Sequence, residues 1–183
     1  MKHRSLSQRL ARRLLPALLA LVLPALAQGE TLEIGMLQPV TLPVQQETGE
    51  TALYLGPTQG FLRADGAALD TAEPFVCFGQ ADCWAMVAPG TPEDFGPVGW
   101  IEAAALDTLD AAAELTFADA LEVMIEDDAP LTADPLHENT PALATLPRGT
   151  RVLLLARYGD WGYVQTELGG IPVRAFVSVA TIL

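Results

Sequence analysis

Apolar residues from position 31 onward occur in short alternating runs that are separated by turns rich in Gly, Pro and Asp. Runs of this length and spacing are typical of strands in a small barrel or sandwich rather than of long amphipathic helices. Residues 88–97 hold three Pro and two Gly, and we expect them to be a loop. We therefore predict an all-β fold with strands at residues 32–34, 40–44, 52–55, 75–78, 83–87, 98–101, 121–125, 152–155, 161–166, 171–173 and 175–177.

The apolar pattern repeats with an offset of 161 − 84 = 77 positions. Setting Trp84 on Trp161 places the apolar run at 75–78 on the run at 152–155. Two copies of one small β unit fit the length better than one irregular domain. The alternative is that two unrelated β segments have been slid into partial register.

The repeat divides the chain into regions. Each unit ends in a short segment, residues 102–106 and 178–183, that suits a helical turn. An Ala-rich stretch separates the units, and we expect it to be a linker with some helical character. The predicted regions are a signal peptide at 1–27, a first β unit at 31–106, the linker at 107–118 and a second β unit at 119–183.

The N-terminus has the layout of a cleaved secretory signal peptide. Five basic residues precede an apolar core at 14–23, and Ala25-Leu26-Ala27 is a small-residue exit of the A-x-A kind. The apolar core carries Pro16 and is shorter than the ~18–20 residues that a membrane anchor needs. We expect cleavage after Ala27, a periplasmic or secreted location, and no membrane insertion of the mature chain.

Charge changes the picture once the signal peptide is set aside. The whole chain has 10 Lys and Arg against 23 Asp and Glu. Five of the basic residues lie within residues 1–27 and none of the acids do, which leaves 5 − 23 = −18 for the mature chain. A surface of this charge repels nucleic acid and anionic lipid and favours a soluble monomer. Two interpretations of this negative charge are open: it keeps the protein soluble, or it binds a basic partner.

The two cysteines, Cys77 and Cys83, are separated by five residues. In an oxidising compartment such a pair is typical of a disulfide, and a hairpin that turns at residues 79–82 would place the two side chains opposite each other. A zinc site needs about four ligands, and His137 is the single His of the mature chain. We predict a Cys77–Cys83 disulfide and no metal or other cofactor.

Residues 146–152, Leu-Pro-Arg-Gly-Thr-Arg-Val, and 159–164, Gly-Asp-Trp-Gly-Tyr-Val, resemble the core motifs of bacterial SH3 (SH3b) domains. The first unit is more divergent but keeps Gly-Trp-Ile at 99–101. The chain departs from the family at residues 131–135, which lack the family's Arg and Gly, and at 175–177, where Ala-Phe-Val stands in place of Gly-Trp-Val. The resemblance implies two tandem small SH3-like β-barrels that bind peptides, cell-wall components or envelope proteins.

No catalytic constellation is found in the sequence. The mature chain has one Ser, Ser178, and one His, His137, so a nucleophile with an adjacent base cannot be assembled. The acidic run at 126–128 lacks the alternating ligands and the turn Gly of a calcium loop. We predict that the protein is not an enzyme.

Aromatic residues remain as candidates for binding. At matching points of the two units they would give a groove rigid apolar contact, and an adjacent Arg would give it a charge for a carboxylate. Core packing of the tryptophans is the competing interpretation. We predict a non-catalytic binding module of the cell envelope for a peptide, a peptidoglycan component or a partner protein. The alternative is an acidic structural or inhibitory protein that binds a basic envelope partner. The candidate ligand-binding residues are Arg157, Tyr158, Trp161, Tyr163, Trp84 and Trp100.

Overall fold

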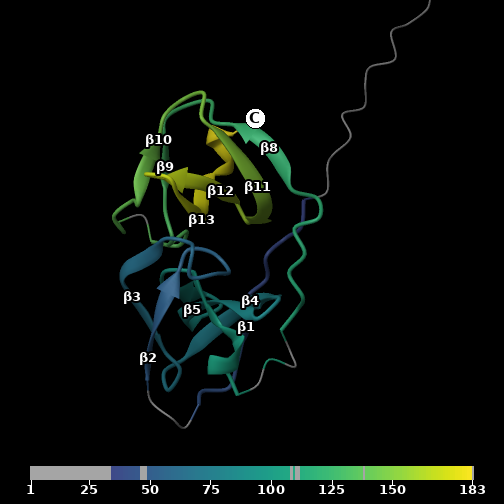
Figure 1. The fold of residues 1–183 in the computed structure, drawn as a ribbon, viewed down its shortest axis with the longest axis vertical. Helices are drawn as coiled ribbons and strands as arrows, with labels where there is room; N and C mark the ends of the chain where they lie inside the picture. The colour runs from purple at the N-terminus through teal and green to yellow at the C-terminus, as the bar shows by residue number, and fades with distance from the viewer. Residues whose placement is uncertain (1–33, 46–48, 108, 110–111, 138, 183) are drawn as a thin grey trace, which may run out of the picture. The chain divides into compact units, whose positions relative to one another are not determined.

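Antiparallel strands make up almost all of the regular structure (Figure 1). The computed structural model describes residues 34–45, 49–107, 109, 112–137 and 139–182, which belong to one compact unit, Glu33–Leu183. The regular elements there are strands and two short 3-10 helices, so the predicted all-β class is confirmed. None of the helices in these residues has the length and apolar character needed to span a bilayer. The predicted signal peptide lies outside the described residues.

The first half of this unit is a single antiparallel sheet. Its strands are β1 (Val40–Thr41), β2 (Glu50–Tyr54), β3 (Arg63–Asp70), β4 (Phe75–Ala81), β5 (Trp84–Thr91), β6 (Asp94–Phe95) and β7 (Gly99–Glu102). They are arranged in the order β1-β4-β5-β7-β2-β3, with β6 paired to β5 at one side. The 3-10 helix η1 (Ala103–Ala105) follows β7, at the predicted helical turn.

The second half has the same strand order. Its elements are β8 (Leu121–Met124), β9 (Ala129–Leu131), β10 (Ala144–Leu146), β11 (Arg151–Tyr158), β12 (Trp161–Leu168), β13 (Ile171–Ser178) and the 3-10 helix η2 (Val179–Thr181). One sheet runs β8-β11-β12-β13, and β9 pairs with β10. Two backbone hydrogen bonds between Thr132 and Phe176 join the end of β9 to β13. The resulting order, β8-β11-β12-β13-β9-β10, corresponds to β1-β4-β5-β7-β2-β3 strand by strand.

The two halves agree in register as well as in order. The hairpin of β4 and β5 has an irregularity after Cys77, and the hairpin of β11 and β12 has one after Leu154, at 154 − 77 = 77 positions further on. Trp84 and Trp161 begin the second strand of each hairpin. A duplicated unit is expected to show the same strand order, the same irregularity and the same Trp position in both copies, as these halves do.

The segment between the halves pairs with the half that precedes it. Leu115 N–H donates to Gln80 O at 2.7 Å, and Gln80 N–H donates to Ala113 O at 2.8 Å. Gly79 has a φ of 140°, and a side chain there would meet the carbonyl of Ala113, so the close approach requires glycine. We expected some helical character in this linker; residues 113–115 instead pair with Gln80 at the edge of β4.

The segment before the first half makes the same contact with the second half. Leu37 N–H donates to Arg157 O at 2.7 Å, and Arg157 N–H donates to Gly35 O at 2.9 Å. Arg157 occupies the position of Gln80, because 157 − 80 = 77. The leading segment of each half is therefore paired with the opposite half, and the exchange is reciprocal.

A second reciprocal pair of hydrogen bonds lies near the ends of the sheets. Val98 N–H donates to Ala133 O at 2.8 Å, and Arg174 N–H donates to Leu55 O at 2.7 Å. Val98 directly precedes β7 and Arg174 lies in β13, whereas Leu55 and Ala133 follow the equivalent strands β2 and β9. Such matched contacts are those of an isologous dimer, here made within one chain.

The core explains why strands β4 and β11 are apolar at successive positions. Phe75 and Cys77 belong to a cluster of buried residues that fills the interior of each half. Val76 and Phe78, which point to the other face of β4, belong to a second cluster that also contains Leu155 and other residues of the second half. A strand that is covered on both faces needs apolar residues throughout.

The predicted Cys77–Cys83 disulfide is wrong, since both cysteines are free thiols in the structure. The hairpin does not turn at residues 79–82; β4 continues to Ala81, and the turn is Asp82–Cys83, with Asp82 at a φ of 52°. Cys77 is therefore opposite Val87 and buried, whereas Cys83 is exposed at the turn, well along the strand from Cys77.

The expected loop at residues 88–97 is also wrong. β5 runs on to Thr91, and β6 returns along it, with Gly90 opposite Phe95. A side chain at Gly90 would meet the backbone of Asp94 and Phe95. The glycine that we interpreted as a loop signal is instead needed for the close approach of two strands.

Candidate binding grooves

Trp100 and Tyr163, two of the predicted ligand-binding residues, are core residues. Their exposed fractions are 0% and 2%. The indole Nε1 of Trp100 donates to the Tyr163 hydroxyl at 2.8 Å, which joins the first half to the second. Burial raises the pKa of Tyr163 far above its ordinary value, so this phenol stays neutral. A ligand at the surface would not reach either side chain.

Arg157 and Tyr158 also contribute to the contact between the halves. The backbone of Arg157 is paired with residues 35–37, and its Nε is buried without a hydrogen-bond partner among the described residues. The half-buried ring of Tyr158 packs edge-on against Phe78 and Phe95, with centroids 6.1 and 5.4 Å apart. Both residues are thus used in packing the two halves together.

Trp84 and Trp161 are different, because each is half-exposed and lines a cavity. The Trp84 groove has a volume of about 330 Å³ and is lined by Glu50, Thr51, Ala52, Tyr54, Trp84, Ile101, Glu102 and Ala105. The Trp161 groove has a volume of about 300 Å³ and is lined by Pro130, Thr132, Asp134, His137, Thr140, Ala142, Trp161 and Ser178. Strand pairing shows that the two grooves are equivalent: Trp84 is opposite Glu102 and Trp161 is opposite Ser178.

The Trp84 groove combines an aromatic corner with carboxylates. The rings of Tyr54 and Trp84 meet edge to face, with centroids 5.7 Å apart and planes at 85°. Glu102 is the cross-strand partner of Trp84, and its Oε1 accepts a hydrogen bond of 3.2 Å from Gln59 Nε2. Glu50 lines the same groove from β2. Rigid apolar surface and negative charge therefore lie together in this groove.

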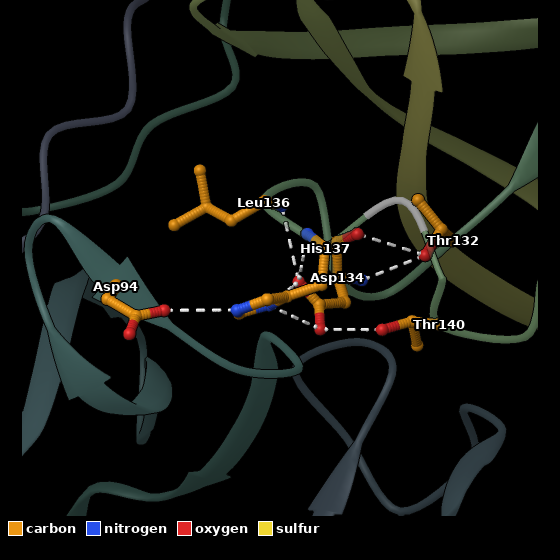
Figure 2. Close-up of polar contacts among 6 residues, drawn as sticks. All are labelled: Asp94, Thr132, Asp134, Leu136, His137 and Thr140. Carbon is orange, nitrogen blue, oxygen red and sulfur yellow. Dashed lines mark hydrogen bonds and ion pairs between the residues drawn. The ribbon is translucent and has the colours of Figure 1, made fainter.

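The Trp161 groove is bordered by a hydrogen-bond network on Asp134 (Figure 2). Asp134 is buried, and its carboxylate accepts from the backbone N–H groups of Leu136 and His137 at 3.2 Å each. It also accepts from Thr140 Oγ1 at 2.9 Å and lies 2.9 Å from His137 Nδ1. Because every partner comes from one short loop, the carboxylate fixes the shape of that loop.

His137 connects this loop to the first half of the chain. Figure 2 shows its ring between two carboxylates: Nδ1 faces Asp134, and Nε2 lies 3.0 Å from Asp94 Oδ1. A neutral imidazole has one N–H, so both contacts are hydrogen bonds only in the imidazolium form. The hydrogen bond and charge of Asp134, with a smaller contribution from Asp94, raise the pKa of His137. With a carboxylate at each ring nitrogen, His137 bridges the two halves, and its protonated form is the one that satisfies both contacts.

Sequence reasoning found Trp84 and Trp161 but missed what surrounds them. Tyr54, Glu50 and Glu102 had no motif to mark them, although pairing the strand at 98–101 with the strand at 83–87 would have put Glu102 near Trp84. His137 was interpreted as a simple loop residue. The nearby Asp134 and Thr140 are common loop formers, so nothing in the sequence distinguished this loop from others.

Metal binding finds no support in the described part of the chain, where no group of three His, Cys, Asp or Glu side chains is placed to hold an ion. The comparisons with known proteins gave no matching family model, no matching curated protein and no matching solved structure.

Proposed function

We propose that the protein is an exported, non-catalytic binding module of the cell envelope, built from two tandem SH3-like barrels. Each half has the meandering antiparallel strands and the terminal 3-10 helix that such barrels combine, which supports this description. The resemblance of residues 146–152 and 159–164 to SH3b motifs points the same way. The ligand is a peptide segment, of a partner protein or of the cell wall, that binds in the Trp84 or Trp161 groove.

One observation carries this proposal. Of the three tryptophans in the chain, Trp100 is fully buried, whereas Trp84 and Trp161 stand half-exposed at equivalent positions and each lines a cavity. An aromatic side chain beside a cavity gives a ligand large apolar contact at low cost in conformational entropy, and such residues dominate many binding interfaces.

The proposal is tested by retention on purified sacculi and on an array of envelope-protein peptides. The protein is expressed from the full-length chain, and Trp84→Ala and Trp161→Ala are compared with the wild type. We expect one variant or both to lose retention while the thermal unfolding midpoint stays close to that of the wild type. Retention that is equal in all three proteins would show that neither groove binds, and no retention of the wild type on either material would refute the binding module.

An acidic interaction protein that binds a basic partner is the second candidate. It is favoured by the imbalance of 23 acidic residues against five Arg after residue 27. Binding of this kind is expected to weaken strongly between low and physiological salt, because exposed charges are screened over about 8–10 Å. Retention that is independent of salt would argue against it.

A further inference from the structure

We propose that the Trp84 groove is a receptor for a single lysine or arginine side chain, presented by an extended segment of a partner protein. This inference rests on the proposed function and names the chemical class of its ligand. It is carried by the aromatic corner, the two carboxylates and the contrast with the Trp161 groove.

The aromatic corner supplies surfaces that attract a cation. The faces of Trp and Tyr rings carry negative electrostatic potential, and an ammonium or guanidinium within about 6 Å of a ring centre is attracted to it. Tyr54 and Trp84 lie at 85° to each other, so an entering side chain can contact one ring by its methylene groups and the other by its charged end. A neutral or anionic end group would gain less from these surfaces.

Two carboxylates complete the receptor. Glu50 and Glu102 are exposed side chains on β2 and β7 that line the cavity together with the aromatic pair. Among the described residues neither Glu forms an ion pair. A cation held over Trp84 would give both a partner, and the lining contains no basic residue to compete with it.

The chain already binds one of its own cations in this way. The guanidinium of Arg174 lies 5.3 Å from the ring centre of Phe61 and 5.1 Å from that of Phe117, while its Nε donates to Gln165 Oε1 at 2.8 Å. Aromatic rings with one polar acceptor thus hold an Arg side chain inside this fold. The Trp84 groove has the same kinds of group, with carboxylates in place of the amide.

The equivalent groove of the second half lacks the second aromatic ring and the exposed Glu side chains. Thr132 takes the place of Tyr54, because Tyr54 pairs with Trp100 and Thr132 pairs with the equivalent Phe176. Ser178 takes the place of Glu102. The one carboxylate in its lining, Asp134, is buried and already engaged by His137, Thr140 and two backbone N–H groups, so it offers an entering cation no free partner. The Trp161 groove is therefore an internal control that should not select for positive charge.

A segment of a protein is a better ligand than a free amine. A single cation on an aromatic pair gains too little to bind tightly against the cost of losing its free motion. Neighbouring residues of an extended segment add contacts, and the net negative charge of the chain attracts a basic partner before it docks. We therefore assign the groove to a basic protein segment.

The test is NMR titration of the full-length protein with three extended Ala-rich peptides that differ at one central residue: Lys, acetyl-lysine or Glu. The chain has three Trp residues, and their indole N–H signals are expected to be separate because their surroundings differ. We expect the Lys peptide to shift the Trp84 signal, the Trp161 signal to stay in place, and the acetyl-lysine peptide to bind about tenfold more weakly. Equal affinity for Lys and acetyl-lysine, or a shift at Trp161 alone, would overturn the inference.

Charge variants separate a specific site from a general field. Glu102→Gln should weaken the Lys peptide about two- to fivefold, whereas Glu73→Gln removes an equal charge from an exposed turn outside the groove and should leave affinity unchanged. If both variants lose the same affinity for the Lys peptide, net charge alone accounts for binding and the inference of a specific site is wrong. If choline binds at Trp84 as well as the Lys peptide does, the groove is a small-cation site and the assignment to a protein segment is wrong. If no peptide binds but sacculus retention still depends on Trp84, the inference fails and the proposed function stands.

Discussion

Replacing Tyr163 by Phe tests whether the two halves depend on the buried hydrogen bond between them. The substitution removes one hydroxyl and keeps the ring. The centroid of this ring lies 5.0 Å from that of Phe176 and 6.2 Å from that of Phe117. The indole N–H of Trp100, fully buried, would then have no acceptor. An unsatisfied buried donor costs about 1–3 kcal/mol.

The measurement is urea unfolding followed by tryptophan fluorescence and by circular dichroism. We expect Tyr163→Phe to lower the free energy of unfolding by about 1–3 kcal/mol with an unchanged m-value. In a chain of this size the unfolding temperature should fall by about 2–4 °C for each kcal/mol. The two probes should report one transition, because the core residues of both halves pack together.

Tyr158→Phe is the matched control for this experiment. Tyr158 also packs between the halves, but its hydroxyl makes no hydrogen bond within the described residues. Its loss should change the free energy of unfolding by less than about 0.5 kcal/mol. If Tyr163→Phe is as stable as Tyr158→Phe, the Trp100–Tyr163 bond does not hold the halves together. Two separate transitions would contradict the shared core.

Two further predictions concern the cysteines and His137. Mass measurement should find two free thiols. In the folded protein a thiol reagent should modify Cys83 rapidly and Cys77 slowly, because Cys77 is buried and burial raises its pKa. A mass lower by two hydrogens would show that the disulfide forms after all. The raised pKa of His137 means that its contribution to stability is fully present below the unfolded value of about 6.5 and is lost as pH rises through the folded pKa. Urea midpoints from pH 5.5 to 8.5 should therefore fall more in the wild type than in His137→Gln, and equal slopes would show that the Asp94–His137–Asp134 bridge is not formed in solution.

The strands could be predicted from the sequence because their signals are local. Alternation of apolar residues and turn-forming Gly and Asp gave the hairpin strands that begin at Trp84 and Trp161, and the offset of 77 positions matches the pairing of both. The turn of the first hairpin was misplaced because Gly79 was interpreted as a turn residue. Gly79 instead lies in a strand, where it allows residues 113–115 to approach.

The pairing partners of the leading segments could not be predicted. Residues 35–37 and 113–115 carry no pattern that distinguishes pairing with their own half from pairing with the other half, since backbone hydrogen bonds are the same in both cases. One signal was present but not used: successive apolar residues at 75–78 and 152–155 indicate strands covered on both faces. A strand of a free-standing barrel would have shown polar residues on its outer face.

The reciprocal arrangement also explains how one groove could acquire a charge preference that the other lacks. Residues that join the halves, such as Phe78 and its equivalent Leu155, are buried and must stay apolar in both copies. Tyr54 and Glu102 belong to neither buried cluster, so their replacement by Thr132 and Ser178 in the second half leaves the core residues unchanged. The duplicated interface therefore fixes the core of each half while leaving the surroundings of each half-exposed Trp free to differ. We therefore expect the two grooves to prefer different ligands, with the Trp84 groove selecting the cationic side chain that we propose for it.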